Sequence, residues 1–322
     1  MSLETEAVLD RRRMKRATSM WRVLAIIGLV AAVGAIVFSG ARGLGLTKPK
    51  QIARVTISGL ITEDRAQLRM LKQIEEADHV AGVLLAVNSA GGTTTGGEAI
   101  YEGLRSLAKK KPVVAQFGTV AASAAYIAGL GTDHIVARGN SITGSVGVIM
   151  QWPEVSELLG KIGVKMNEIK SGPLKAEPSP FHPLNEGGRQ VTEEMIREGQ
   201  QWFLGLVRAR RKIDTAAVPG LEQGRVFSGR EAKRLGLVDE IGGEAEAIRW
   251  LEQQRKVPKN LKVVDWAPRR SSSWSFISAL SLTGTSGIVS EVREAVGEVL
   301  AGAGLAAIRL DGLVSVWQPS KN

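Results

Sequence analysis

A regular alternation of apolar and amphipathic segments, which begins at Ala53, constrains the fold of this chain more than any other feature. The apolar segments 53–61 (ARVTISGLI), 82–88 (GVLLAVN) and 113–118 (VVAQFG) have the length and composition of β-strands, and stretches with helical periodicity separate them. Strands joined through helices pair in parallel, and strands that are apolar along their whole length are typical of a sheet covered on both faces. The sequence therefore predicts an α/β domain built on a mostly parallel sheet.

The same pattern continues as far as Trp266, with one interruption. Residues 171–188 hold four prolines and three glycines, which is too irregular for a helix or a central strand, so we expect an arm or a loop there. The other expected elements are a Gly/Thr loop over 89–97, helices over 64–77, 98–110, from about 122 and over 189–213, strands over 133–138 and 145–150, a helix-turn unit over 228–243, and a last helix and strand that end at Trp266.

The N-terminus holds an uncharged apolar run, 23–38 (VLAIIGLVAAVGAIVF), close to the roughly 17 to 20 residues of a membrane-spanning helix. More basic residues precede this run than follow it, so the positive-inside rule places residues 1–20 in the cytoplasm, residues 21–42 in the cytoplasmic membrane, and the rest of the chain outside the cytoplasm. A cleaved secretory signal peptide is the alternative. However, the run exceeds the usual apolar region of such peptides, and Phe38 to Ala41 form only a weak cleavage site.

Two regions follow the predicted anchor: a folded domain over 50–266 and a C-terminal extension over 267–322. The extension is amphipathic, and its Glu298, Arg309 and Asp311 argue against a second membrane span.

Composition excludes several classes of function. The chain has no cysteine, which removes thiol nucleophiles, cysteine-ligated zinc and disulfides. Its net charge is +10, but the basic residues are spread along the chain and do not form a run interleaved with aromatic residues. We therefore expect no nucleic-acid partner.

The segment 118–126 (GTVAASAAY) places Ser123 where a predicted strand ends and a helix begins. Backbone amides at a helix N-terminus, together with the positive end of the helix dipole, favour negative charge that develops on a reacting oxygen. Small neighbours such as Ala122 let a substrate backbone approach. An N-capping serine in a tight turn is the other interpretation of this pattern.

A second loop of interest, 88–92 (NSAGG), follows the second predicted strand. Its glycine pair can turn backbone N–H groups into a concavity that accepts an oxyanion, although a plain turn has the same pattern. The segment 91–97 (GGTTTGG) lacks the G-x-G-x-x-G spacing of dinucleotide sites, and no Gly-Lys-Ser/Thr follows as in a P-loop.

A serine nucleophile needs a base, and the three histidines offer no convincing Ser/His/Asp set. His79 and His134 fall at the ends of expected elements, and His182 falls in the proline-rich arm. A neutral lysine can replace histidine when its surroundings disfavour the ammonium ion. Lys175 is the candidate because two apolar residues of the arm flank it, although a solvated surface charge is the more ordinary interpretation of such a lysine.

Taken together, these motifs resemble the signal peptide peptidase A family of serine proteases, which are relatives of the Clp protease and crotonase fold. The resemblance spans roughly residues 50–265. Five blocks occur in the order found in the family: NSAGG (88–92), VAASAAYIA (120–128), TGSVGVIM (143–150), KSGPLKAEPSPF (170–181) and GRVFSGREAKRLGLVDEIGG (224–243). The resemblance implies a crotonase/Clp-protease-like ββα superhelix with an N-terminal transmembrane helix, and it makes residues 50–266 the protease domain.

The resemblance also implies the roles of individual residues. It makes Ser123 the nucleophile, Lys175 the general base, and Ser145 a hydroxyl that positions the lysine. The amides of Gly92 and Ala124 would form the oxyanion hole.

Small residues beside these groups complete the expected site. Gly91 and Ala122 are the expected contacts of the substrate. The sequence departs from the family at Ala90, where proline is usual, and at Ala124 and Ala125, where two glycines are usual. These side chains stay small, but a methyl group at each position could narrow the cleft.

The expected function is that of a membrane-anchored serine endopeptidase with a Ser/Lys dyad, which degrades hydrophobic peptides such as cleaved signal peptides and needs no metal or cofactor. A catalytically impaired membrane scaffold that binds such peptides is the alternative. An acyl-CoA enzyme of the crotonase type fits less well, because an extracytoplasmic domain would not meet coenzyme A. Family members with one domain per chain form rings, so we expect a ring-shaped homo-oligomer in which Lys175 of one chain serves Ser123 of its neighbour.

Overall fold

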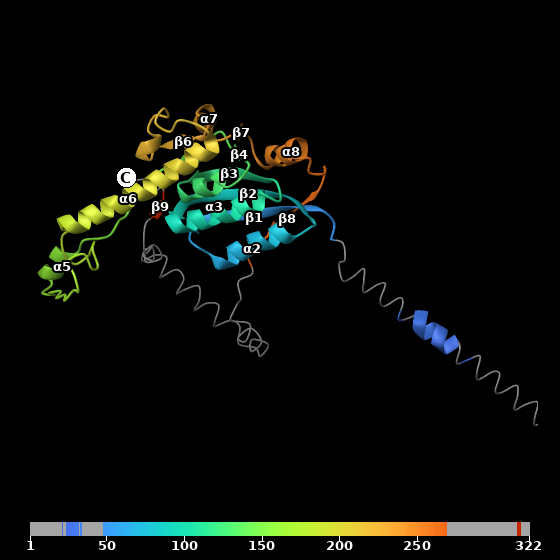
Figure 1. Ribbon diagram of the computed structural model, residues 1–322, viewed down its shortest axis with the longest axis horizontal. Coiled ribbons are helices and arrows are strands. Elements are labelled where there is room, and N and C mark those ends of the chain that lie inside the picture. The colour runs from blue at the N-terminus through green and yellow to red at the C-terminus, as the bar shows by residue number, and fades with distance from the viewer. Residues whose placement is uncertain (1–20, 22–23, 32, 34–47, 269–313, 317–322) are drawn as a thin grey trace, which may run out of the picture. The chain divides into compact units, whose positions relative to one another are not determined.

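The computed structural model describes Trp21, residues 24–31, Val33, residues 48–268 and residues 314–316 (Figure 1). The chain divides into two units, Met1–Pro49 and Lys50–Asn322, and the second unit contains the sheet.

A single sheet forms the centre of the second unit. Its strands are β1 (Gln51–Ile61), β2 (Val80–Thr93), β3 (Val113–Ala122), β4 (His134–Ala137), β5 (Ile142–Gly144), β6 (Val226–Ser228), β7 (Glu240–Ile241), β8 (Lys262–Trp266) and β9 (Val314–Val316). The main order is β6-β5-β3-β2-β1-β8, and β4 also pairs with β3. The ladder from β8 through β1, β2 and β3 to β5 is parallel, whereas β6 runs antiparallel to β5.

Helices connect most of the strands. They are α2 (Arg65–Glu76), α3 (Thr94–Ala108), α4 (Ala124–Leu130), α5 (Ser156–Lys161), α6 (Glu186–Arg211), α7 (Gly229–Arg234) and α8 (Glu244–Gln254), with a 3₁₀ turn η1 (Leu221–Gln223). Side chains cap several of them. The Thr93 hydroxyl accepts a hydrogen bond from the Gly96 amide at the start of α3, and the Asn185 side chain accepts one from the Gly188 amide at the start of α6.

Both faces of the sheet are covered, as the apolar strands predicted. Helices α2, α3, α4 and α6 pack on one face, against residues such as Val55, Leu85 and Ala115. The residues that alternate with these along the strands, such as Leu84 and Val114, point to the other face and pack against α8. In β1, β2, β3 and β4, alternate side chains therefore contribute to two separate cores.

The structure confirms the expected α/β class and the mostly parallel sheet, and it corrects two elements. The predicted loop over 89–97 is wrong in its first half, because β2 continues to Thr93 before α3 begins. The predicted strand over 145–150 is also wrong: the strand β5 lies just before it, over Ile142–Gly144. The motif after β5 is irregular because Ser145 adopts a positive φ of 51°, which ends the strand.

The expected membrane anchor over 21–42 falls mostly outside the described residues. Those inside it, namely Trp21, residues 24–31 and Val33, are helical, and their large apolar side chains are exposed. Within the residues that the structure describes, no helix is both long and apolar enough to span a bilayer. Apart from β9, the C-terminal extension also lies outside the described residues from residue 269 onward.

Candidate active site

Ser123 occupies the junction between β3 and α4. Its amide donates to the Gly144 carbonyl of the neighbouring β5 at 2.9 Å, and its carbonyl accepts from Ile127 in the first turn of α4. The residue is 1% exposed, at the edge of the main core. Ser123 is thus fixed through its backbone to two strands and one helix.

The backbone of Ser123 is strained. Its φ of 58° and ψ of −122° are unusual for a residue with a Cβ, and its side chain forms no capping hydrogen bond with α4. Ser123 thus occupies the N-cap position of α4, but its side chain does not cap the helix. Strained serines at a sharp strand-to-helix turn are typical of nucleophiles, because the turn lifts the hydroxyl out of the sheet.

The glycine pair of β2 lies at the same edge of the sheet as Ser123. Ser89 of β2 pairs with Ala121 of β3 in the parallel ladder, so Gly92 and Ser123 follow that pair on adjacent strands. Gly92 is buried, and a Cβ there would overlap with the Ile61 carbonyl of β1. Only glycine fits this close approach of two backbones.

Asn88 and Ser89 hold this edge together, which the sequence motif did not reveal. The Asn88 side-chain oxygen accepts from the Val120 amide of β3 at 3.1 Å. The Ser89 hydroxyl donates to the Gly59 carbonyl at 2.6 Å and accepts from the Gly91 amide at 3.1 Å. Both residues therefore link β2 to its neighbours at the point where the glycine pair begins.

Ser145 follows directly on Gly144, the residue whose carbonyl binds the Ser123 amide. The Ser145 amide donates to the Arg225 carbonyl at 3.0 Å, which connects the end of β5 with the segment before β6. Ser123 and Ser145 both have positive φ, and they directly follow the paired strands β3 and β5. The structure thus brings together these two of the three predicted catalytic residues.

A cavity of about 340 Å³ opens beside Ser145. Val148, Ile149 and Ile196 form apolar parts of its wall. Gln200 of α6 also lines it and donates to the carbonyls of Val146 and Glu222, so this side chain ties the loop after β5 to α6 and η1.

Ala122, Ala124 and Ala125 are all fully buried. Ala124 and Ala125 belong to the main core cluster, and a Cβ at Gly97 of α3 would lie 3.2 Å from the Ala124 methyl group. The methyl groups that replace the family's two glycines therefore pack against the core.

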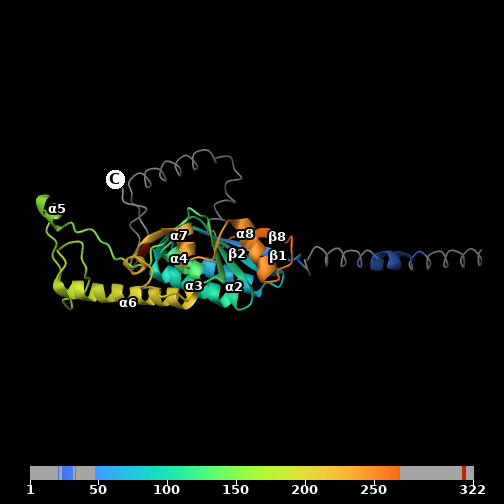
Figure 2. The ribbon, with the colours of Figure 1, turned by 90° about the horizontal axis from the view of Figure 1, so that it is seen from above.

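Lys175 lies elsewhere in the chain. It is exposed in a turn before α6, where Leu174 approaches Gly187. Asn185 at the start of α6 and Gln200 beside the Ser145 loop are about 22 Å apart along the helix, at the usual rise of about 1.5 Å per residue. Figures 1 and 2 show α5 and the adjoining loops beyond the edge of the sheet. The structure does not bring Lys175 to Ser123 within one chain.

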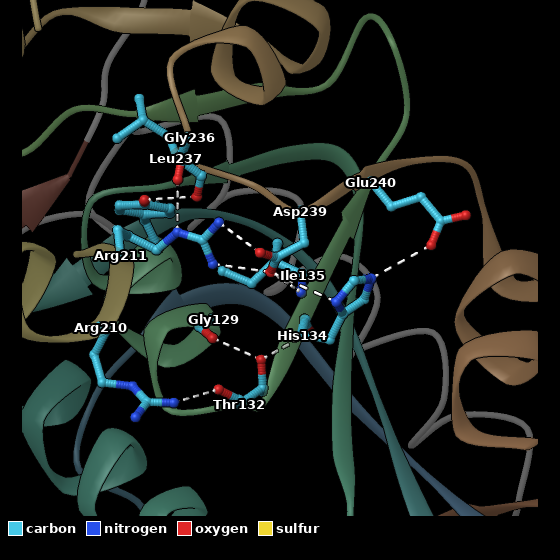
Figure 3. Close-up of polar contacts among 11 residues, drawn as sticks. Gly129, Thr132, His134, Ile135, Arg210, Arg211, Gly236, Leu237, Asp239 and Glu240 are labelled. Atoms are coloured by element: carbon cyan, nitrogen blue, oxygen red, sulfur yellow. Dashed lines mark hydrogen bonds and ion pairs between the residues drawn. The ribbon is translucent and has the colours of Figure 1, made fainter. Parts of the chain in front are cut away.

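Polar contacts fasten the far end of α6 to α4, the helix that begins after Ser123 (Figure 3). Arg210 donates to the carbonyls of Leu130 and Thr132 at 2.9 Å each, which satisfies groups at the C-terminus of α4. Arg211 forms two hydrogen bonds with the Asp239 carboxylate, at 2.9 and 2.7 Å. The long helix is therefore anchored at one end and extends away from the core at the other.

Two ionisable groups in this network have shifted pKa values. Burial alone would raise the pKa of Asp239, but hydrogen bonds and charge from Arg211 hold it below its ordinary value. Burial raises the pKa of Tyr126, whose hydroxyl donates to the Leu237 carbonyl at 2.8 Å. The contacts of Tyr126 and Asp239 thus join α4 and α6 to residues 237–239.

The histidines lie away from Ser123. His79 and His134 are at the N-terminal ends of β2 and β4, opposite the strand ends that hold the site, and His134 stacks on Trp250. His182 lies in the arm beside Lys170 and Glu177. A Ser/His pair is thus excluded by position. Within the described residues, no group of three or more acidic or histidine side chains could hold a metal ion.

Comparison with known proteins identifies the family. The model of peptidase family S49 matches residues 105–258, and the Clp protease model matches residues 50–140. The sheet thus belongs to a mixed α/β fold, and residues 50–140 are similar to Clp proteases.

Three curated relatives are similar over more than half of this chain. A candidate protease of Methanocaldococcus jannaschii is 37% identical, over 63% of this chain and 65% of its own length. A candidate protease of Synechocystis is 36% identical, over 62% of this chain and 73% of its own length. A candidate signal peptide peptidase SppA of Enterococcus faecium is 36% identical, over 65% of this chain and 64% of its own length.

The match thus spans about two thirds of the length of these relatives. Given the matched family model, the similarity to these relatives and the serine junction at the end of β3, this chain belongs to peptidase family S49, the signal peptide peptidase A family of serine peptidases.

Proposed function

We propose that this chain is a serine endopeptidase in which Ser123 is the nucleophile and Lys175 the general base. The observation that carries the proposal is the strained, buried turn at Ser123, next to a second strained serine, Ser145, and beside the glycine pair of β2. Strain of this kind persists only where the surrounding structure enforces it, and it clusters at active sites.

The mechanism follows from these groups. The Ser123 hydroxyl attacks the scissile carbonyl carbon while its proton passes to the Lys175 amine. Amides of Gly92 and Ala124 stabilise the negative charge on the carbonyl oxygen. The C–N bond then breaks, and the lysine returns its proton to the leaving amine. Water then attacks the acyl carbonyl carbon while its proton passes to Lys175. The ester C–O bond breaks, and the lysine returns the proton to the Ser123 oxygen, which restores the free hydroxyl and the neutral amine.

An extended peptide is the substrate class that fits this edge of the sheet. Gly91, Gly92 and Thr93 of β2 already pair with the antiparallel strand β9. This edge is therefore able to accept a strand, which is how a peptide gains main-chain hydrogen bonds in strand addition. The apolar residues around the cavity beside Ser145 favour hydrophobic side chains, such as those of cleaved signal peptides.

We infer further that the dyad is completed between subunits of a ring-shaped homo-oligomer. Lys175 is exposed and precedes the end of α6 that extends away from the core. In the structure the arm around it is longer than the sequence predicts, and we define it as residues 150–185. It presents large apolar side chains to solvent, including Leu158, Ile162 and Ile169. Exposed apolar surface of this kind is typical of an interface, and burial against a neighbour would also keep water from the lysine.

The proposed location is the outer side of the cytoplasmic membrane, with residues 21–42 as a single anchor and the N-terminus in the cytoplasm. The apolar run over 23–38 and the basic residues before it support this proposal. A tethered active site would meet peptides released into the membrane at high local concentration.

A fluorophosphonate probe tests the proposed chemistry, because only an activated serine reacts with it. Mass spectrometry of the labelled protein should locate the adduct on Ser123, and Ser123→Ala should not label. Absence of any adduct on a folded, assembled protein that still binds hydrophobic peptides would instead identify a non-catalytic scaffold.

A further inference from the structure

A cluster of four polar side chains lies at the base of the loop that carries Lys175. The Lys170 ammonium is 2.7 Å from Glu168, 3.1 Å from Glu177 and 3.2 Å from the Nε2 atom of His182. The same Nε2 atom is 3.2 Å from Glu177. These contacts join residues on both sides of Lys175.

Between these residues the chain forms a tight double turn. The Lys175 amide donates to the Gly172 carbonyl at 3.2 Å, and the Glu177 amide donates to the Leu174 carbonyl at 3.3 Å. Ala176, directly after the lysine, has a positive φ of 64°. Non-glycine residues adopt this conformation only where the surroundings enforce it. The shape of the turn is therefore specified, although Lys175 itself is exposed.

Glu177 is the residue that connects this turn to α6. Its side chain is only 3% exposed, and a Cβ on Gly188 would lie 3.1 Å from the Glu177 Cβ. One carboxylate oxygen binds Lys170, while the other, Oε2, is buried without a hydrogen-bond partner among the described residues. A buried, half-satisfied carboxylate is costly for stability. Such costs are typical of positions where geometry serves function.

The charge of Lys170 persists at any pH at which the peptidase would work, because hydrogen bonds with Glu168 and Glu177 raise the pKa of Lys170 above its ordinary value. The surroundings of Lys170 also differ from those of Lys175. Three side chains hold its ammonium group in place, whereas Lys175 extends from the turn into solvent.

We propose that Glu177 and Lys170 are positioning residues, which hold the turn around Lys175 in the shape needed to insert the lysine into the site of a neighbouring subunit. This inference rests on the proposed function of Lys175. It adds that the arm is shaped before assembly, so that little conformational entropy is lost when the lysine enters the site. Neither residue contacts the substrate.

The test compares Glu177→Ala with the matched control Glu193→Ala, which removes an exposed carboxylate from α6. We expect Glu177→Ala to lower kcat by about 100-fold with KM changed less than about twofold, because misplacing a catalytic group by about 1 Å has an effect of that order. Glu177→Gln retains the shape and one acceptor, so it should recover part of kcat. Glu193→Ala should behave as the wild type.

Co-assembly separates positioning of Lys175 from a general structural role. Mixed with Ser123→Ala chains, Glu177→Ala chains should regain activity, because an intact arm then reaches an intact serine. Mixed with Lys175→Ala chains, they should not. Recovery with both partners, wild-type kcat for Glu177→Ala, or loss of the oligomer in that variant would each overturn the proposal. Full activity of Lys175→Ala would instead overturn the proposed function itself.

Discussion

The edge of the sheet around Ser123 and the arm around Lys175 are built in opposite ways. Ser123 is 1% exposed and is held by β3, β5 and α4. Helix α5 in the arm contains no buried residue, and Ile169 is fully exposed at 105%. The region around Ser123 is buried within its own chain. The arm, in contrast, has apolar surface that no other part of the described chain covers.

This difference indicates that folding of the chain fixes the region around Ser123, whereas assembly with a partner would fix the region around Lys175. A nucleophile and its oxyanion donors need fixed geometry, which a packed core supplies. A lysine base needs a dry environment, and an exposed arm obtains one only when it is buried against another surface. The arm thus has the properties of a part that is completed by a partner.

The largest expected effects are those on catalysis, and they should be equal in the two regions. Ser123→Ala and Lys175→Ala should each lower turnover about 10³-fold or more, because each removes a reacting group. Lys175→Arg should not restore activity, since arginine stays protonated. Peptide hydrolysis by the purified variants measures this loss. Retention of more than about a tenth of wild-type turnover by Ser123→Ala would show that the nucleophile is wrongly assigned.

Stability should separate the two regions. Phe117 is fully buried in the core, so Phe117→Ala should lower the free energy of unfolding by about 3–5 kcal/mol. Ile169→Ala should leave the free energy of unfolding of the monomer nearly unchanged, but it should weaken the proposed oligomer. Urea unfolding and sedimentation velocity measure the two quantities. A stability loss at Ile169 comparable with that at Phe117 would mean that the arm packs on its own chain.

Replacing a glycine with alanine should also affect stability and activity differently in the two regions. Gly92→Ala forces a Cβ against the Ile61 carbonyl, so it should destabilise the domain by about 1–3 kcal/mol and abolish activity. Gly160→Ala in α5 meets no atom within 4 Å and should have no such effect. Thermal unfolding and peptide hydrolysis of both variants provide the comparison, and an active, stable Gly92→Ala variant would contradict the assigned geometry.

The smallest expected effect is a loss of folding stability at acid pH, which we assign to the ion pair between Arg211 and Asp239. Because the pKa of Asp239 is held below its ordinary value, its ion pair with Arg211 stabilises the fold at neutral pH, and this contribution is lost as the pH falls below about 4. The difference in unfolding free energy between wild type and Asp239→Asn should therefore shrink from pH 6 to pH 3. A constant difference over this range would remove the proposed role of the carboxylate.

The sequence predicts the core better than the arm for a physical reason. Strands β1, β2 and β3 are specified by local composition, because each is apolar along its length. The extension of β2 through Gly91 and Gly92 was missed, since it depends on pairing with distant strands and not on β propensity. The strand expected at 145–150 failed because the strain at Ser145 is a tertiary effect.

The candidate site was predicted from motifs, whereas the contacts that support it were not. Ser123 stands out by its place between a strand and a helix, whereas the contacts of Asn88 and Glu177 join residues whose proximity no local pattern reveals. The motifs predict which groups react. The packing that fixes them appears only in three dimensions.

Co-assembly of two inactive variants tests the shared active site most directly. Ser123→Ala and Lys175→Ala chains, each inactive alone, should regain a substantial fraction of wild-type hydrolysis when they assemble in equal amounts, because some interfaces then pair an intact serine with an intact lysine. A mixed oligomer verified by native mass spectrometry that remains completely inactive would contradict the account, since each chain would then need its own dyad.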